Sequence, residues 1–463
     1  MKKAIILAAG KGTRMKSAHP KVVHKVCGKE MVNHVIDAAH NAGVNETIVV
    51  LGHGIDEVKE AVGEDVKIAV QSEQLGTAHA VRMAEDSINP DDTVVVLCGD
   101  TPLIEADTLR DFFEYHDKGE FAVTVLTTSV EDPTGYGRII RDAEGHLLKI
   151  VEQKDANEEE KAVKEINSGI YCFNGKFLKD SLAKVDNNNA QGEYYLPDTI
   201  ELIRNAGGKA GAYMGATIEE LMGVNSRNQL SNAERIMRRR INEKHMTNGV
   251  TIIDPDATYI DADVEIGNDT IILPGCMLRK GSKIGVGCEI GPQTSMENSV
   301  VGDYTNVKKS EMIDATVGDH TKVGPYAYLR PKAHVGNNCK VGDFVEMKNA
   351  KFGDGSKASH LSYIGDAEVG KNVNVGCGVV FVNYDGKNKF KSIVKDNAFV
   401  GSNSNLVAPV TVEEDTFIAT GSTITDDVPT GCLAIARERQ VLKPGWVEKK
   451  RKRDEEAEKN KQK

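Results

Sequence analysis

The stretch KAIILAAGKGTRMKSAHPK, residues 3–21, decides how the first half of the chain folds. Its apolar run from Ala4 to Ala8 is typical of a buried strand in a parallel sheet. The run breaks into Gly10-Lys11-Gly12-Thr13-Arg14, and Lys21 follows shortly after. Glycines let backbone N–H groups approach a ligand closely, and with nearby cations they suit a polyphosphate. The spacing is neither GxxxxGK[ST] nor GxGxxG, because Met15 holds the place of the third glycine. A glycine-rich turn with solvated cations is the structural alternative.

Apolar runs and helical patterns then alternate up to residue 229. We expect strands at 47–51, 93–98 and 121–127, and helices at 30–40, 77–88 and 109–117. This βαβα order predicts an α/β, Rossmann-like domain with a mostly parallel sheet and helices on both faces. Ligands of such sheets bind beyond the carboxyl ends of the strands, where the loop after Ala8 would lie.

Several polar residues fall in positions that suit such a ligand. Asp100 directly follows the strand at 93–98, where a carboxylate can hold Mg²⁺, although it can equally be a turn residue before Pro102. Gln71, Gly76 and Thr77 offer an amide and exposed backbone that suit the edge of a nucleotide base.

The second half, residues 251–438, has a different pattern, in which apolar residues recur every six positions. Neither a helix nor an ordinary strand has this period, whereas a hexapeptide parallel β-helix does. The recurring residues are Ile260, Ile266, Ile272, Leu278, Ile284 and Ile290, then Val317, Val323, Leu329, Val335 and Val341, and finally Val400, Leu406, Val412, Ile418 and Ile424.

Two interruptions mark where a site on this β-helix is expected. The six-residue register slips near residues 351–361, and residues 381–400 look like an inserted loop. His360 lies in the first interruption and is a candidate general base, although a lone histidine is more often structural.

Composition excludes several classes of protein. A net charge of -11 over 463 residues argues against a nucleic-acid binder with a broad basic face. No apolar run reaches the ~20 residues of a membrane span. The eight cysteines are scattered without a CxxC pair, so we expect neither a zinc site nor a disulfide framework, and a cytoplasmic location follows. We expect residues 230–250 to form a charged helical linker, and residues 439–463 to form a charged, disordered tail.

Taken together and in order, the motifs of the first half resemble those of sugar-nucleotide pyrophosphorylases. They are AAGKGTRM, HPK, QLGTAHA, GD, GYGRI, VEQKDA, EINSGIY, NNNAQGEYYLPD and GVN. The AAG start is similar to uridylyltransferases that act on N-acetylglucosamine 1-phosphate. The resemblance implies a nucleotidyltransferase domain over residues 1–229 that uses UTP and Mg²⁺. It implies that Arg14 and Lys21 are catalytic and that Asp100 and Asn225 hold the metal. The implied nucleotide and sugar ligands are Leu7, Ala8, Ala9, Gly10, Lys21, Gln71, Gly76, Thr77, Gly137, Glu152, Asn167 and Asn225.

The second half resembles the glucosamine-1-phosphate acetyltransferase half of the bifunctional enzymes that make UDP-N-acetylglucosamine. This resemblance implies a left-handed β-helix, a homotrimer, and His360 as the base that deprotonates the glucosamine amine. Arg330, Lys348, Tyr363 and Asn374 would bind the sugar phosphate. The acetyl-CoA groove would be lined by Cys377, Asn383, Tyr384, Ser402, Thr420 and Arg437.

The expected function is therefore acetylation of glucosamine 1-phosphate by acetyl-CoA, followed by uridylyl transfer from UTP. The product would supply peptidoglycan and other cell-envelope polymers. Cys98 stands where an aromatic residue is expected, and Cys377 and Thr420 stand where alanines are expected. Two alternatives are a single-activity pyrophosphorylase with a regulatory β-helix and a β-helix scaffold with a nucleotide-sensing domain.

Overall fold

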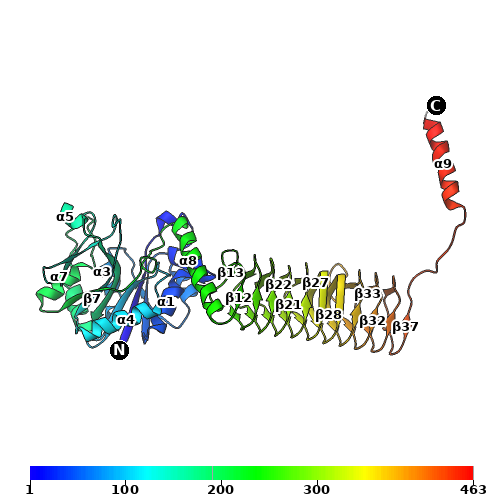
Figure 1. Cartoon of the computed structure of the whole chain (residues 1–463), viewed down its shortest axis with the longest axis horizontal. Helices are drawn as coiled ribbons and strands as arrows, with labels where there is room; N and C mark the ends of the chain where they lie inside the picture. The colour runs from blue at the N-terminus through cyan, green and yellow to red at the C-terminus, as the bar shows by residue number, and fades with distance from the viewer. Residues whose placement is uncertain (190, 462–463) are drawn as a thin grey trace. The chain divides into compact units, whose positions relative to one another are not determined.

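The computed structural model describes residues 1–189 and 191–461. The chain divides into two compact units (Figure 1). The first comprises Met1–Asn248 and Pro255–Val264, and the second comprises Gly249–Asp254 and Glu265–Lys463. Residues 255–264, which the repeat pattern placed with the second half, thus belong to the first unit.

The first unit is built on a mixed sheet with strand order β11-β7-β10-β6-β1-β4-β5. Pairing is parallel except at β10, which runs antiparallel to both of its neighbours. The predicted mostly parallel sheet is therefore confirmed. The strands are β1 (Lys2–Ala8), β4 (Glu46–Leu51), β5 (Lys67–Val70), β6 (Thr93–Cys98), β7 (Val123–Ser129), β10 (Glu165–Asn174) and β11 (Ala210–Met214), with the hairpin β8 (Arg138–Arg141) and β9 (Leu147–Val151) beside them.

Successive residues of each strand point to opposite faces of the sheet, so the apolar strands present side chains on both faces. Helices cover both faces and bury these side chains. In β1, Ala4 and Ile6 belong to one hydrophobic cluster and Ile5 belongs to the other. The first cluster includes residues of α1 and α4, and the second includes residues of α3, α6 and α7. The helices are α1 (Met31–Asn41), α2 (Ile55–Val62), α3 (Thr77–Arg82), α4 (Ala106–Lys118), α5 (Glu158–Lys161), α6 (Gly175–Leu182) and α7 (Asp198–Asn205). The expected helix at 77–88 is wrong in length: α3 ends at Arg82, and a separate 3₁₀ turn covers Glu85–Ser87.

The charged segment after residue 226 is the helix α8 (Arg227–Thr247), which begins with Ser226 as its N-cap. The helix packs against β2 (Lys25–Val26) and β13 (Tyr259–Ile260), both in the first unit. Ala233 and Ile236, which lie on one side of the helix, are buried. The segment described as a linker is thus largely a part of the first unit.

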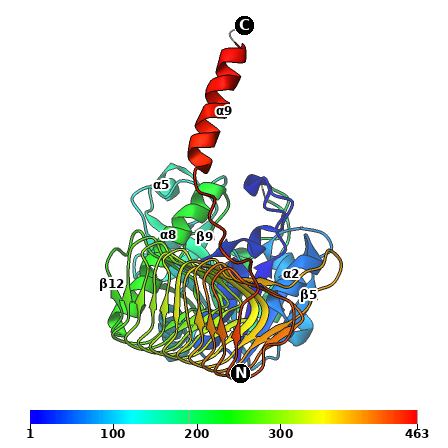
Figure 2. The same cartoon turned by 90° about the vertical axis from the view of Figure 1, so that its right-hand side faces the viewer.

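The second unit is a parallel β-helix of short strands, whose successive coils lie one behind another in Figure 2. Each strand pairs in parallel with a strand one coil further on, as in Val317↔Val335 and Val323↔Val341. The recurring apolar residues, such as Ile272, Leu278 and Ile284, point inward and are buried. The six-residue period therefore arises because each short strand buries one apolar side chain before the chain turns.

The strands form three faces. The first face contains β12 (Thr251–Ile252), β15 (Ile271–Ile272), β18 (Glu289–Ile290), β21 (Asn306–Val307), β24 (Lys322–Val323), β29 (Asn374–Val375), β32 (Phe399–Val400), β35 (Phe417–Ile418) and β37 (Leu433–Ala434). The second contains β16 (Met277–Leu278), β19 (Ser295–Glu297), β22 (Glu311–Ile313), β25 (Tyr328–Leu329), β30 (Val380–Val382), β33 (Asn405–Val407) and β36 (Thr423–Ile424). The third contains β14 (Glu265–Ile266), β17 (Lys283–Ile284), β20 (Val300–Val301), β23 (Thr316–Val317), β26 (Ala333–Val335), β31 (Ser392–Val394) and β34 (Val410–Val412). Two longer strands, β27 (Lys340–Phe352) and β28 (Lys357–Val369), continue around all three faces.

The corners between faces require unusual backbone angles. Asn298, Asp314, Asn349 and Asp366 all have positive φ, a region that asparagine and aspartate tolerate better than most residues. Their side chains also bond between coils: Asn298 Nδ2 donates to Asp314 Oδ1 at 2.6 Å, and Asn349 Nδ2 donates to Asp366 Oδ1 at 2.7 Å. Corner residues thus fasten each coil to the next.

Buried hydroxyl and thiol groups form a second ladder inside the β-helix. Cys339 Sγ donates to the carbonyl of Gly353 at 3.2 Å, and its backbone N–H donates to Thr321 Oγ1 at 3.0 Å. Cys288 has the same role three coils earlier, where its Sγ donates to the Gly302 carbonyl at 3.0 Å. These cysteines satisfy backbone groups, so their role is structural.

The two interruptions have different structures. Pairing is continuous at the first, but Val341 pairs with Ala358 whereas Val323 pairs with Val341, so this coil is one residue shorter. The sequence register slips for this reason. At the second, the extra residues lie at 383–391, between β30 and β31, while 392–394 and 399–400 are regular strands.

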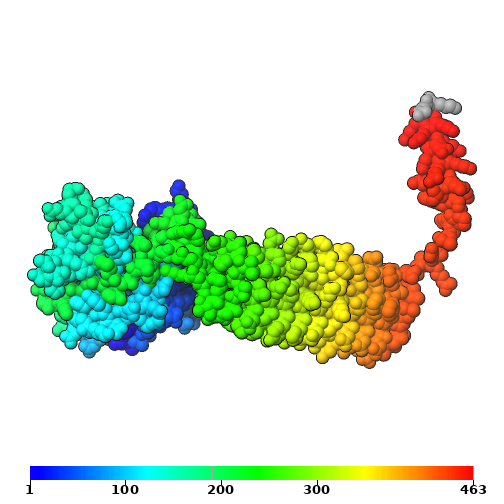
Figure 3. Space-filling model, in the orientation of Figure 1, coloured from blue at the N-terminus to red at the C-terminus, as the bar shows by residue number. Residues whose placement is uncertain are grey.

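The charged tail differs from the expected disorder. Trp446–Lys461 forms the helix α9, none of whose residues is buried (Figures 1 and 3). Its glutamate and lysine residues have high helix propensity, which favours a helix without tertiary contacts. Within the described residues, no helix is long and apolar enough to cross a membrane.

Candidate functional sites

The loop after β1 lies at the carboxyl edge of the sheet, beside the turn that follows β6. Gly12 has φ +57°, and a Cβ on it would lie 2.7 Å from Lys21 Cβ. The position therefore needs glycine for both its backbone angle and the close approach of Lys21. Leu7, Ala8, Ala9 and Gly10 line a cavity of about 270 Å³ at this edge. Arg14 is exposed in the turn Thr13–Met15 and does not line that cavity.

Lys21 brings together two oxygens that are far apart in the sequence. Its ammonium is hydrogen-bonded to Asp100 Oδ2 and, at 2.9 Å, to Asn225 Oδ1. The backbone N–H of Val224 donates to the Asp100 carbonyl at 2.8 Å, which holds the two segments side by side. A carboxylate and an amide oxygen that converge on one cation position are the donor set that suits Mg²⁺. The residues present therefore fit the metal that the resemblance implies.

Beyond Asp100 the cavity extends towards the predicted base-reading residues. Gln71, Gly76 and Thr77 line it together with Glu193, which the sequence reasoning missed. A neighbouring cavity of about 260 Å³ shares Leu7, Thr77, Cys98 and Glu193 with the first, so the two are continuous. Gln191 and Tyr195 also line it; both lie in the motif NNNAQGEYYLPD, but the motif alone assigned them no role.

The second cavity is lined by residues that were predicted to bind the sugar. Glu152 and Asn167 line it, and Gly137 lies behind them, since a Cβ there would be 3.0 Å from Glu152 Oε1. Burial raises the pKa of the Glu152 carboxyl. Asn167 Oδ1 accepts hydrogen bonds from Tyr171 Oη and from the Gly169 N–H, both at 3.0 Å. Its amide nitrogen is thereby left to face a ligand.

Cys98, the departure from the expected aromatic residue, lies between the two cavities. Burial raises the pKa of its thiol to about 12. The thiol is therefore protonated at neutral pH and is not a nucleophile. It contributes a small, apolar surface where an aromatic ring would offer stacking.

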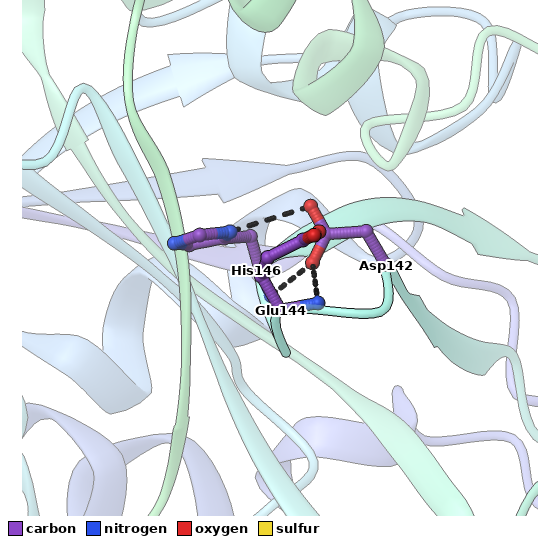
Figure 4. Close-up of side chains that lie close together, drawn as sticks. All are labelled: Asp142, Glu144 and His146. Carbon is purple, nitrogen blue, oxygen red and sulfur yellow. Dashed lines mark hydrogen bonds and ion pairs between the residues drawn. The ribbon is translucent and has the colours of Figure 1, made fainter.

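A separate group of potential metal ligands lies in the β8–β9 hairpin turn: Asp142, Glu144 and His146 (Figure 4). Asp142 Oδ1 accepts the backbone N–H groups of Glu144 and His146 at 3.1 and 2.7 Å. The other oxygen pairs with His146 Nδ1 at 3.3 Å. These contacts stabilise the turn itself, which accounts for the cluster.

On the β-helix, His360 is paired with a carboxylate. His360 Nδ1 lies 2.7 Å from Asp343 Oδ1, one coil away at the corner between the first and second faces. Because a carboxylate accepts the Nδ1 proton, the pair leaves Nε2 as the free basic nitrogen. The sequence reasoning proposed His360 but missed Asp343, which lies seventeen residues earlier, the length of one coil.

Most of the residues expected to bind acetyl-CoA lie along the same corner of the β-helix as His360. The N–H of Asn403 donates to the Cys377 carbonyl at 2.7 Å, and the N–H of Gly421 donates to the Ser402 carbonyl at 2.9 Å. Cys377, Ser402 and Thr420 therefore follow His360 on successive coils. Arg437 lies next to this row, since its Cδ is 3.7 Å from the Cβ position of Gly421. Tyr384 lies apart, exposed in the 383–391 loop with its hydroxyl donating to the Gly386 carbonyl at 2.6 Å.

The expected sugar-phosphate ligands gather mainly at the next corner, between the second and third faces. Arg330 is paired with Glu346 at 2.7 Å and Lys348 with Asp366 at 3.3 Å. Asn383 joins this cluster, because its Nδ2 lies 2.5 Å from Asp366 Oδ2 and 3.4 Å from Tyr363 Oη. Hydrogen bonds from Asn349, Asn383 and Lys348 outweigh burial and lower the pKa of Asp366. Asn374 is not in this cluster, since it lies on the first face beside Phe399.

Lys389 is a further cation of this cluster that the sequence reasoning missed. It interacts with Lys348, which lowers the pKa of Lys389, and it also lies within the field of Arg330. Together with Lys332, Lys351 and Lys391 it lines a cavity of about 390 Å³. Asp366 and Glu368 also line this cavity, and Glu368 pairs with Lys351 and Lys391, but the cations are in excess, which suits an anionic group. Lys389 lies in the inserted loop, where no repeat predicts which side chains return to the β-helix.

The comparisons with known proteins agree with both halves. The nucleotidyl transferase family model matches residues 3–218, and the bacterial transferase hexapeptide model, six repeats, matches residues 314–349. A bifunctional protein GlmU from Clostridioides difficile (strain 630) is 68% identical over 455 residues, 98% of this chain and 99% of the relative. Proteins of the same name from Caldanaerobacter subterraneus subsp. tengcongensis and Alkaliphilus metalliredigens are 58% and 56% identical, each over 97% of this chain and 98% of its own length. With this similarity along almost the whole of both chains, the protein belongs to the GlmU family of bifunctional proteins.

Proposed function

We propose that this protein carries two transferase activities, one in each half. On the β-helix, an acetyl group passes from acetyl-CoA to glucosamine 1-phosphate. In the first unit, UMP passes from UTP to the resulting N-acetylglucosamine 1-phosphate, which gives UDP-N-acetylglucosamine and pyrophosphate. Membership of the GlmU family supports both steps, and the product would supply peptidoglycan and other cell-envelope polymers.

The acetyl-transfer step needs a neutral amine. In this proposal His360 Nε2 takes a proton from the glucosamine ammonium, and the amine nitrogen attacks the thioester carbonyl. The C–S bond then breaks as the carbonyl re-forms, the CoA thiolate takes the proton held on His360 Nε2, and the second proton of the nitrogen passes to solvent. Asp343, 2.7 Å from His360 Nδ1, orients the ring and stabilises its protonated form. Arg330 and Lys348 would offset the charge of the sugar phosphate.

The uridylyl-transfer step needs no nucleophilic side chain, because the phosphate oxygen of the sugar is itself the nucleophile. That oxygen attacks the α-phosphorus of UTP as the bond to pyrophosphate breaks. Lys21 and Arg14 would offset the developing charge, and Gln71, Gly76 and Thr77 would hold the uracil. Asp100 and Asn225 would hold Mg²⁺, which when bound neutralises charge on the phosphates.

We also propose a homotrimer in which neighbouring copies complete the acetyl-transfer site. Within one β-helix, His360 and Lys348 belong to different corners and Asn374 lies on the first face. Tyr326, Phe344 and Leu361, 54%, 58% and 58% exposed, form an apolar row beside His360 that a second copy would cover. Light scattering after size-exclusion chromatography tests the assembly.

We further propose a cytoplasmic location, because all eight cysteines are free thiols.

The observation that carries the bifunctional proposal is the Asp343–His360 pair at the head of the Cys377, Ser402 and Thr420 row. A β-helix that served only regulation would have no need of an oriented base there. The test is to supply glucosamine 1-phosphate with acetyl-CoA, with and without UTP, to wild type and His360→Ala. His360→Ala should lose acetyl transfer and keep uridylyl transfer from N-acetylglucosamine 1-phosphate. Retained acetyl transfer in this variant would remove His360 as the base, whereas absence of acetyl transfer in the wild type would favour the single-activity alternative.

A further inference from the structure

The side-chain amide of Gln71 has both of its hydrogens committed within the protein. Its Nε2 donates to the carbonyl of Gly76 at 3.1 Å and to Nδ1 of His79 at 3.0 Å. The residue is 3% exposed and lines the cavity at the strand ends. An amide nitrogen carries two hydrogens and no acceptor, so the only group of Gln71 left for a ligand is Oε1.

The Gly76 carbonyl decides which way round the amide lies, because a carbonyl only accepts. With Oε1 in place of Nε2, two acceptor oxygens would face each other. The carbonyl itself is held in place: it also accepts the N–H of Ala80 at 3.1 Å, and the segment on either side bonds Tyr194 through the Leu75 carbonyl and the Ala78 N–H at 2.8 and 2.9 Å. Gly76 has φ +116°, and a Cβ there would lie 2.5 Å from the Tyr194 carbonyl oxygen. The Gly76 carbonyl therefore cannot turn away to suit a reversed amide.

His79 supplies the second constraint. Because Gln71 Nε2 can only donate, His79 Nδ1 must accept, which requires the neutral ring with its proton on Nε2. The His79 ring lies beside the Tyr194 ring, with the two centroids 6.4 Å apart. Arg82 lies over the Tyr194 ring, with its Cζ 4.8 Å from the ring centroid. His79 is therefore held by its own neighbours in a position to receive the amide hydrogen.

We propose that His79 is a positioning residue that keeps Gln71 Oε1 directed at the nucleotide base, so that the site selects uracil over cytosine. This role rests on the proposed function, in which Gln71 reads the base of UTP. The N3 position of uracil carries a hydrogen that Oε1 can accept. Cytosine has an unprotonated acceptor at N3, which would face the same oxygen without a hydrogen between them. A reversed amide would offer N–H to cytosine N3 and lose the bond to uracil.

The test compares UTP with CTP in the uridylyl-transfer assay, using full-length protein. His79→Phe keeps a ring against Tyr194 but has no nitrogen, and His79→Asn is the matched control, because its Oδ1 can accept in place of Nδ1. For His79→Phe, the ratio of kcat/KM for UTP to that for CTP should fall by about fivefold to tenfold, the value of one hydrogen bond. The change should appear in KM for the nucleotide rather than in kcat. His79→Asn should keep the wild-type ratio to within about twofold.

The possible results separate this role from a packing role and from the proposed function itself. Equal losses in His79→Phe and His79→Asn, or an unchanged ratio in His79→Phe, would overturn the positioning role. Equal use of CTP and UTP by the wild type would overturn it too. Absence of any UTP turnover by the wild type would overturn the proposed function and this inference with it. The helical circular-dichroism signal, which comes mainly from the first unit, reports whether each variant is folded there, and His79→Leu replaces His79→Phe if the latter does not fold.

Discussion

Replacing Lys21 by methionine tests whether the strand-end cluster exchanges one cation for another. The Lys21 ammonium bonds Asp100 Oδ2 and Asn225 Oδ1, the two oxygens proposed to hold Mg²⁺. The side chains of Lys21 and Asp100 are 13% and 19% exposed, so solvent screens their attraction only in part. A divalent cation that binds between the two oxygens must displace the ammonium, which is then free to move to the phosphates of UTP.

The size of the effect follows from this contact. A hydrogen bond to a charged group contributes ~1.5–3 kcal/mol, which corresponds to about a tenfold to hundredfold change in a binding constant. Lys21→Met removes this competitor, so divalent metal should bind the nucleotide-free protein about tenfold to a hundredfold more tightly. Uridylyl transfer should nevertheless fall by about a hundredfold or more, because the charge that offsets the phosphates is lost.

Titration with Mn²⁺, followed by electron paramagnetic resonance without nucleotide, measures the affinity directly. Mn²⁺ takes the same oxygen ligands as Mg²⁺. Lys11→Met is the matched control, since it removes the same charge from the same loop at an exposed position. If Lys21→Met binds Mn²⁺ no more tightly than Lys11→Met, the ammonium does not compete for the metal position and the reasoning is wrong.

Three further predictions follow from other contacts. Asp343→Ala should lower kcat for acetyl transfer by about tenfold to a hundredfold and leave uridylyl transfer unchanged, since His360 stays but loses the carboxylate that orients it and stabilises its protonated form; equal rates in wild type and variant would contradict the role of the pair. Iodoacetamide should label the exposed Cys377 and Cys432, and acetyl-CoA should protect only Cys377, as read by peptide mass spectrometry; labelling of Cys377 that acetyl-CoA does not slow would remove it from the groove. Burial and nearby carboxylates raise the pKa of Asp198 to about 6, so the fold favours its protonated form and loses this contribution as pH rises through 6. Asp198→Asn should therefore stabilise the first unit by about 1–2 kcal/mol at pH 7.5, an advantage that disappears below about pH 4, as followed by melting temperature at each pH.

Most of the fold could be predicted from local patterns. The apolar run at residues 4–8 and the run at 93–98 are adjacent strands, and the six-residue period is a β-helix. The pattern failed where neighbours in space decide the outcome. The helix at 77 ends at Arg82, where that side chain turns to donate to the carbonyls of Leu182 and Val185, a hundred residues away. The shortened coil at residues 341–358 left only a slip in the apolar register, from which no pairing could be read.

For the sites, motifs named the individual side chains, but sequence reasoning did not reach their partners. Asp343, Asp366 and Lys389 have no motif of their own, and each matters because a coil or a loop returns it to a named residue. Glu193 lies within the motif NNNAQGEYYLPD, but only the structure shows that it lines the nucleotide cavity.

Local sequence patterns are enough to predict that the chain begins with a strand and a glycine-rich loop and continues into a β-helix, because both are short-range patterns of apolar spacing and backbone freedom. The meeting of Lys21, Asp100 and Asn225 at one cation position is visible only in the folded chain, as is the pair of contacts from Gly76 and His79 that leaves Gln71 a single acceptor. A hydrogen bond tolerates only a few tenths of an ångström in the distance between its two atoms, and Lys21 and Asn225 are 204 residues apart in the chain. Strand order and coil length set those distances, and no local sequence pattern specifies either of them.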